Sequence, residues 1–194
     1  MDLKEKINEK VRQIEEILTR SDTCFRYCKY LNKPEDPREN SILNKYRVLD
    51  YARVSFVIIL ILDLCKLFID REKYSLRRIL NIVIEDYNKI KFSQEINRDE
   101  LELLRDNLSL PQTKEIVNKL RSLRDNHYAH LDSTRPELND IMPTFDEFNY
   151  LITQAGKILA LLDQKLNNHS VTRFVDNMDK ADNILKQLLK AENI

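Results

Sequence analysis

The stretch Arg121-Ser-Leu-Arg-Asp-Asn-His-Tyr-Ala-His-Leu-Asp132 closes a predicted helix and gathers an unusual set of reactive side chains. It holds two arginines, two histidines, a tyrosine and two carboxylates, and His127 and His130 are two of only three histidines in the chain. Imidazole titrates near neutral pH, and guanidinium is a permanent set of hydrogen-bond donors. Together they suit proton transfer beside a phosphate, which indicates RNA chemistry.

The spacing within this stretch resembles a known signature. Arg124, followed by the polar Asp125 and then by His130, is similar to the R-x(4–6)-H motif of HEPN domains. The longer string 123–132 resembles the abortive-infection AbiU-type branch of that superfamily, as do the upstream stretches 62–70 and 75–80. The resemblance covers roughly residues 40 to 165.

The resemblance implies a metal-independent endoribonuclease that acts in phage defence by abortive infection or in a toxin–antitoxin system. In this interpretation the 2′-hydroxyl of RNA attacks the adjacent phosphate, His130 transfers protons and Arg124 stabilises charge on the phosphoryl oxygens. The products would carry a 2′,3′-cyclic phosphate and a 5′-hydroxyl. The neighbouring residues would orient or support these two, or contact a second phosphate: Asp125, Asn126, His127, Tyr128, Asp132 and, for the phosphate, Arg121.

The same residues also have structural explanations. His127 lies in line with the apolar stripe of its helix, which favours a hydrogen-bonded core histidine over a catalyst. Arg124 could pair with Asp125 of another chain or with a buried acid such as Asp63. The other motif residues fit packing, a helix end, a loop start or a solvated surface: Tyr128, His130, Asp132 and Arg121.

A competing hypothesis is a non-catalytic helical module that binds RNA, a nucleotide or a partner protein. The chain has 32 basic and 32 acidic residues, and its pI is about 6.8. Without a global field, any RNA site must be a local cluster. The balanced charge fits this second hypothesis, and the sequence does not decide between the two.

No metal or other cofactor is predicted. Histidines 127 and 130 lack a clear acidic third ligand for a zinc-dependent hydrolase. Cys24 and Cys28 could join histidines around zinc, but no second ligand pair follows at finger spacing.

Composition predicts an all-α protein. The 194 residues include one glycine, five prolines and no tryptophan, and 33% are charged, whereas sheets and tight turns usually need more glycine. We expect an antiparallel HEPN-like bundle of five to seven helices in a single domain, residues 1–194. Its HEPN-like core would span about 40–165, with an N-terminal helix 2–31 and a C-terminal helix 170–190 packed on it.

Caps and proline breaks give the predicted helix bounds. The prolines at 34 and 37 end the first helix, Ser75 caps a later one, and Thr144 and Glu147 form a capping box. The predicted helices span residues 2–31, 41–70, 75–90, 97–108, 111–131, 144–166 and a final stretch from Ser170.

Neither a signal peptide nor a membrane span is predicted. The N-terminus is charged, and the most apolar stretch, 54–69, is interrupted by Asp63 and Lys66 and is shorter than the roughly 20 residues that span a bilayer. Three cysteines without a signal peptide favour reduced thiols in the cytoplasm. Asp63 is costly to bury alone, so we expect a salt bridge to an arginine of a neighbouring helix.

Helix geometry suggests a homodimer. At about 100° per residue, Arg124 and His130 point about 120° apart on a regular helix. Either the helix ends or bends between them, or a second chain completes the site, and the resemblance favours the second explanation because HEPN domains commonly pair. The stripe of Ile116, Leu120 and Leu123 would then help to join the chains. A cognate antitoxin would be a further partner.

Overall fold

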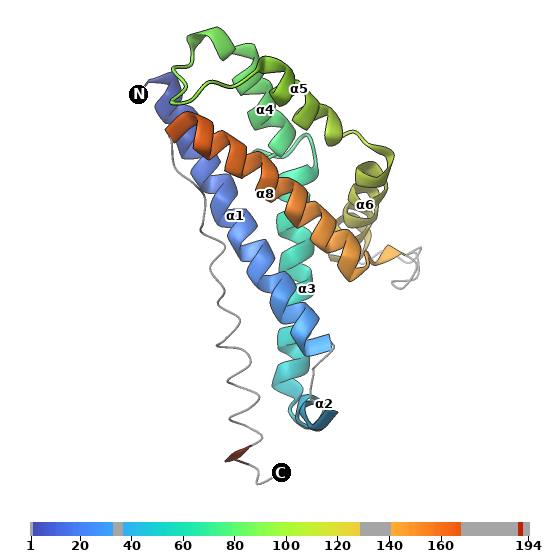
Figure 1. The fold of residues 1–194 in the computed structure, drawn as a ribbon. Helices are drawn as coiled ribbons and strands as arrows, with labels where there is room; N and C mark the ends of the chain where they lie inside the picture. Colours follow the sequence, from blue (N-terminus) through green and yellow to red (C-terminus); the bar gives the residue numbers. More distant parts are fainter. Residues whose placement is uncertain (1, 33–36, 129–140, 168–189, 192–194) are drawn as a thin grey trace.

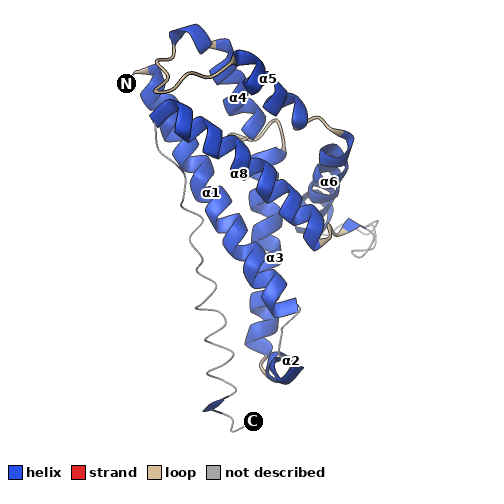
Figure 2. Ribbon diagram, in the orientation of Figure 1, coloured by secondary structure: helices blue, strands red, loops and turns tan. Residues whose placement is uncertain are grey.

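The computed structural model describes residues 2–32, 37–128, 141–167 and 190–191, and every regular element in these ranges is helical (Figures 1 and 2). The predicted all-α fold of packed helices is therefore confirmed. None of the described helices is long and apolar enough to cross a membrane. The elements are α1 (Leu3–Asn32), α2 (Pro37–Lys45), α3 (Arg47–Phe68), α4 (Leu76–Glu85), the 3-10 helix η1 (Tyr87–Lys89), α5 (Arg98–Asn107), α6 (Pro111–Ser122), the π-helix η2 (Leu123–Tyr128) and α8 (Phe145–Asn167).

The core is organised around α1, a helix of 30 residues. Its apolar positions recur at helical spacing and are buried, as Ile7, Val11, Ile14 and Leu18 illustrate. The helix packs against α3 and α8, and both run antiparallel to it (Figure 1). Because α6 contacts α3 as well, the motif at the end of α6 rests on this core.

Several predicted helix starts are confirmed at their caps. The side chain of Asn97 accepts a hydrogen bond from the Asp99 amide at the start of α5. Pro111 opens α6, where its missing N–H costs nothing. At α8, the Thr144 amide donates to Glu147 Oε2 at 2.7 Å and the Glu147 amide donates to Thr144 Oγ1 at 3.2 Å, so the predicted capping box is formed.

The prediction of one helix over 41–70 was wrong. Helix α2 already begins at Pro37, and the backbone becomes extended at Tyr46, with φ −105° and ψ 100°, before α3 starts. Neither glycine nor proline marks this break. A small second cluster of Tyr30, Leu31 and Ile42 packs α2 against the end of α1, which favours the turn over a continuous helix.

One other helix end differs from the prediction, and one predicted helix is not tested. The helix that starts after Ser75 ends at Glu85 and is followed by η1, so it does not continue as an α-helix to Ile90. Its start is where it was predicted, but the Ser75 hydroxyl makes no capping hydrogen bond, so the prediction of a Ser75 cap was wrong. The predicted C-terminal helix lies almost wholly outside the described residues, of which 190–191 are helical.

Asp63 has the predicted partner. Its carboxylate accepts hydrogen bonds from Arg20 on α1, Nε at 2.5 Å and Nη2 at 2.8 Å, and from Lys66 Nζ at 2.8 Å. The aspartate is buried, whereas both cations reach solvent. The ion pair between Asp63 and Arg20 therefore links α3 to α1.

The stripe expected to join two chains is instead buried within one. Ile116, Leu120 and Leu123 are at most 1% exposed and belong to the main core. Any dimer contact through the motif helix must therefore use another face. Three exposed large apolar side chains lie on the first half of α3: Val48, Tyr51 and Val54.

Candidate phosphate-binding site

The motif occupies a π-helical turn. Helix α6 ends at Ser122, and residues Leu123–Tyr128 continue it with the wider π geometry. A uniform α-helix to Leu131 was therefore a wrong prediction for this segment, and the 120° divergence calculated from it does not apply. Turns of this kind are rare and occur frequently at functional sites. Buried Leu123 anchors the turn in the core, and the next residue, Arg124, lies half-buried at the surface.

Two carboxylates hold the guanidinium of Arg124. Its Nε donates to Asp125 Oδ1 at 2.8 Å, and its Nη1 donates to Glu72 Oε1 at 2.8 Å. Asp125 is the next residue in the π turn, whereas Glu72 comes from the turn that links α3 to α4. The arginine therefore joins two segments that are far apart in the sequence. Its direction is fixed from both sides.

This pair of contacts leaves part of the guanidinium available. An arginine has five N–H donors, and Nη2 of Arg124 has no hydrogen-bond partner among the described residues. The hydrogen bond to Asp125, opposed by partial burial, raises the pKa of Arg124. The group is thus a permanently charged donor of fixed orientation.

A polar pocket of about 600 Å³ opens beside Arg124. Two segments supply its walls, the α3–α4 turn and the end of the motif helix. Its lining residues are Ile69, Asp70, Arg71, Glu72, Arg121, Arg124 and Asp125. Each segment overlaps a stretch that carries the sequence resemblance, 62–70 or 123–132, and the fold brings the two together at one site.

The ionisable side chains that line this pocket are balanced in number. Three arginines face three carboxylates. Among the described residues, no cluster of three or more His, Cys, Asp or Glu side chains is arranged to hold a metal ion. The chemistry that these walls offer a ligand is therefore hydrogen bonding and charge, with the arginines as the groups suited to an anion.

Cys65 is a buried residue close enough to Arg124 to interact with it electrostatically. The thiol of Cys65 on α3 donates to the carbonyl of Leu120 at 3.5 Å, which ties α3 to the last turns of α6. Burial raises the pKa of the Cys65 thiol to about 12. Cys65 is therefore a protonated packing residue and not a nucleophile.

The structure brings together some of the predicted site residues. Arg121, Arg124 and Asp125 line the same pocket, and Asp125 accepts a hydrogen bond from Arg124. Arg124 pairs with Asp125 of its own chain, and Asp63 pairs with Arg20 and Lys66. Asn126, which was expected to help orient the catalytic side chains, donates to Ser122 Oγ at 3.1 Å, and its predicted role stays a prediction.

The remaining predicted residues cannot be placed in the pocket. The backbone of His127 and Tyr128 belongs to η2, but their side chains lie outside the described part of the chain. The predicted proton-transfer residue His130 and the supporting residue Asp132 lie outside the described residues altogether. Their roles stay predictions.

Sequence reasoning missed Glu72 and Arg71. Both lie in the short charged run after α3, where acidic and basic residues alternate and none stands out by type. Their relevance depends on the path of the α3–α4 turn, which brings them against the end of α6. The closest signal was the upstream resemblance at 62–70, which ends two residues before Glu72.

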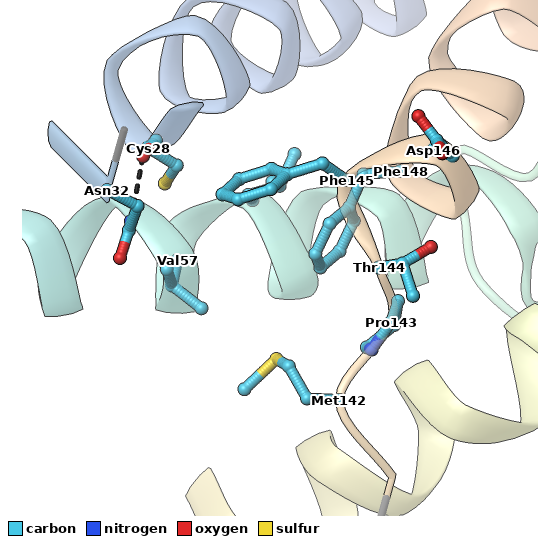
Figure 3. Close-up of a pocket in the computed structure, with 10 residues that line it drawn as sticks. Cys28, Asn32, Val57, Met142, Pro143, Thr144, Phe145, Asp146 and Phe148 are labelled. Carbon is cyan, nitrogen blue, oxygen red and sulfur yellow. Dashed lines mark hydrogen bonds between the residues drawn. The ribbon is translucent and has the colours of Figure 1, made fainter. Parts of the chain in front are cut away.

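A second pocket, of about 510 Å³, is of a different kind. Side chains from α1, α3 and the start of α8 surround it, with the rings of Phe145 and Phe148 prominent (Figure 3). Asp146 and the Cys28 thiol are its ionisable groups, and burial raises the pKa of that thiol to about 12. It therefore offers no cation to a phosphate.

A helical bundle with Arg124 at the end of its motif helix agrees with the resemblance to HEPN domains. The chain matches the AbiU2 family of HEPN domains over residues 4–189, and it belongs to that family. The match extends beyond the predicted 40–165 at both ends. It makes the protein an abortive-infection-related HEPN protein. No curated protein and no solved structure matches the chain.

Proposed function

We propose that this protein is a metal-independent endoribonuclease of the HEPN type, acting in abortive infection or as the toxin of a toxin–antitoxin pair. The observation that supports this best is the Arg124 guanidinium, held by Asp125 and Glu72 at the side of a polar pocket. A charged donor whose direction is fixed before the reaction stabilises negative charge that develops on a phosphoryl group. It does so without reorganising during the reaction.

The proposed reaction is an internal transesterification. The 2′-hydroxyl oxygen loses its proton and forms a bond to the neighbouring phosphorus, and the bond from phosphorus to the 5′-oxygen breaks. The 5′-oxygen takes up a proton, which leaves a 2′,3′-cyclic phosphate and a 5′-hydroxyl. His130 transfers protons, and the Nη2 group of Arg124 donates to a phosphoryl oxygen.

The test is RNA cleavage in the presence of EDTA. Wild-type protein should cut RNA under these conditions and give 2′,3′-cyclic phosphate ends. His130→Ala should lose cleavage with little change in melting temperature, because the proton-transfer group is removed. His127→Ala should instead lower the melting temperature, if His127 is a core residue that loses packing. Cleavage that needs added metal, or that persists in His130→Ala, would contradict this assignment.

One observation favours a second function, that of a non-catalytic module that binds RNA, a nucleotide or a partner protein. The arginines and carboxylates that line the pocket are equal in number, and two of those carboxylates already occupy Arg124. Such a site can recognise a ligand without performing chemistry. Tight RNA binding without cleavage, at any metal concentration, would support this function over the first.

We also propose that the active form is a homodimer, and that a cognate antitoxin restrains it if the protein is a toxin. Pairing would let each chain complete the site of the other. The buried stripe of α6 leaves the exposed side of the motif helix, which carries Arg121, for such a contact. Light scattering at micromolar concentration tests the dimer, and a strict monomer would rule it out.

A further inference from the structure

Arg71 and Arg121 stand out among the charged residues of the polar pocket. Arg71 comes from the α3–α4 turn and Arg121 from the last turn of α6, so they approach the pocket from two different segments. Both are exposed. Within the described part of the chain, neither has an acidic partner within ion-pair distance. Arg124, in contrast, is paired with two carboxylates.

The lining carboxylates are committed elsewhere. Glu72 and Asp125 both bind Arg124, each at 2.8 Å. Asp70 accepts from Arg77 Nε at 3.0 Å, and Arg77 itself lies outside the pocket lining. The pocket has equal numbers of arginines and carboxylates, but their charges are unevenly distributed within it. Excess negative charge surrounds Arg124, and excess positive charge lies on Arg71 and Arg121.

We propose that Arg71 and Arg121 together form an anion subsite that binds the phosphate next to the one at Arg124 on a single-stranded RNA. This inference rests on the proposed function, which places the first phosphate at Arg124. A guanidinium presents a planar fork of donors that matches phosphate oxygens, so two of them can hold one phosphate from two sides.

A single strand suits this site better than a duplex. The pocket of about 600 Å³ is concave and is built from a turn and a helix end. An unpaired strand can bend its backbone into such a recess, whereas a duplex presents its phosphates on a stiff convex surface. Without a net charge on the whole chain, this local pair must supply the attraction.

The salt dependence of binding tests the subsite. Binding of a short single-stranded 2′-O-methyl RNA, which lacks the attacking hydroxyl, is followed by fluorescence anisotropy over a range of salt concentrations. Loss of one phosphate contact makes the slope of log K against log salt shallower by about 0.7 for a single strand. Arg71→Gln should show this change together with several-fold weaker binding. Arg78→Gln, which removes an exposed arginine outside the pocket, should match wild type.

A second variant and a second ligand extend the binding measurement. Arg71→Lys keeps the charge and should restore the slope, while its affinity stays below wild type because the forked geometry is lost. A mononucleotide should bind much more weakly than the strand, because it cannot occupy two anion positions.

The subsite would be overturned by an unchanged slope in Arg71→Gln, by a mononucleotide that binds as tightly as the strand, or by the absence of RNA binding. These outcomes differ from failure of the proposed function. If Arg71→Gln makes the salt slope shallower but wild type does not cut unmodified RNA, the proposed subsite is supported and the proposed nuclease activity is not. If wild type cuts RNA and Arg71→Gln has an unchanged slope and cleavage rate, the nuclease stands and the subsite does not.

Discussion

At the scale of single residues, two carboxylates fix the orientation of the motif arginine, Arg124. Glu72 was not part of the predicted site, yet it fixes one side of the Arg124 guanidinium while Asp125 fixes the other. A flexible side chain such as arginine loses less conformational entropy on binding a ligand when its orientation is already fixed. Glu72 is thus a positioning residue for Arg124.

Removing Glu72 should therefore affect the rate of cleavage more than RNA binding. We expect Glu72→Ala to lower kcat by about ten- to a hundredfold with little change in KM, since misplacing one catalytic group has costs of this order. Glu72→Gln keeps an acceptor oxygen and should retain most of the activity. Glu100→Ala, an exposed carboxylate on α5, is the control. Faster cleavage by Glu72→Ala would mean that Glu72 shields Arg124.

The three cysteines make a prediction about alkaline pH. Burial raises the pKa of Cys24 to about 11 and those of Cys28 and Cys65 to about 12, from a usual value of 9.0. A thiol whose pKa is raised by folding stabilises the folded state fully below pH 9.0, and this contribution is lost as pH rises toward 11 to 12. Urea unfolding at increasing pH should show the loss.

Alkylation gives an independent check of the same thiols. At pH 8 the folded protein should react slowly with iodoacetamide, because only thiolates react, and all three cysteines should label after unfolding. A cysteine that labels rapidly in the folded protein would show that it is not buried as described.

At the scale of helices, the start of α8 depends on a local device. Thr144 and Glu147 satisfy each other's backbone amides there. Thr144→Ala should lower the free energy of unfolding by about 1 kcal/mol, whereas Thr144→Ser should keep the cap. Thr23→Ala in the middle of α1 is the control and should cost nothing, because alanine is the better helix former. Chemical denaturation measures all three, and equal effects of Thr144→Ala and Thr23→Ala would contradict the capping role.

Three helix starts were predictable from sequence because local side-chain and backbone chemistry determines them. Asn97, Pro111 and Thr144 each act on their own first turn, so neighbouring residues suffice to recognise them. The break at Tyr46 could not be predicted in this way. It depends on Ile42 packing against α1, a contact between segments that the sequence alone does not bring together.

In the candidate site, too, the contacts within one short stretch were predictable, and those between distant segments were not. Arg124 and Asp125 are adjacent in the motif, and their pairing follows from one short stretch. Glu72 and Arg71 join them only through the α3–α4 turn, so no spacing within the sequence indicates their role. The π geometry of Leu123–Tyr128 was also missed, because uniform α-helical spacing was assumed where the hydrogen bonds widen.

At the scale of the whole molecule, the central question is whether two chains share each site. If Arg124 of one chain acts with His130 of the other, Arg124→Ala and His130→Ala homodimers should both be inactive. A mixed dimer would regain one intact site. Co-refolding equal amounts should give about half heterodimer and roughly a quarter of wild-type turnover, because both the proton-transfer and charge-stabilising groups are then present at one site.

The mixing experiment needs proof of exchange. Mass measurements should confirm that heterodimers form, and mixing each variant with an identical copy of itself is the matched control. A confirmed heterodimer without activity would remove the shared-site arrangement. Arg124 would then act with His130 of its own chain, or both copies of each residue would be required.

The π turn at Leu123–Tyr128 also bears on how such a motif can vary in evolution. Its hydrogen bonds enclose one residue more than those of an α-helical turn. A residue inserted there is absorbed locally, and the helix on either side keeps its phase. Relatives with a shorter interval between arginine and histidine would need no such widening. Tolerance of one extra residue in the signature is therefore a property that a single π turn can confer.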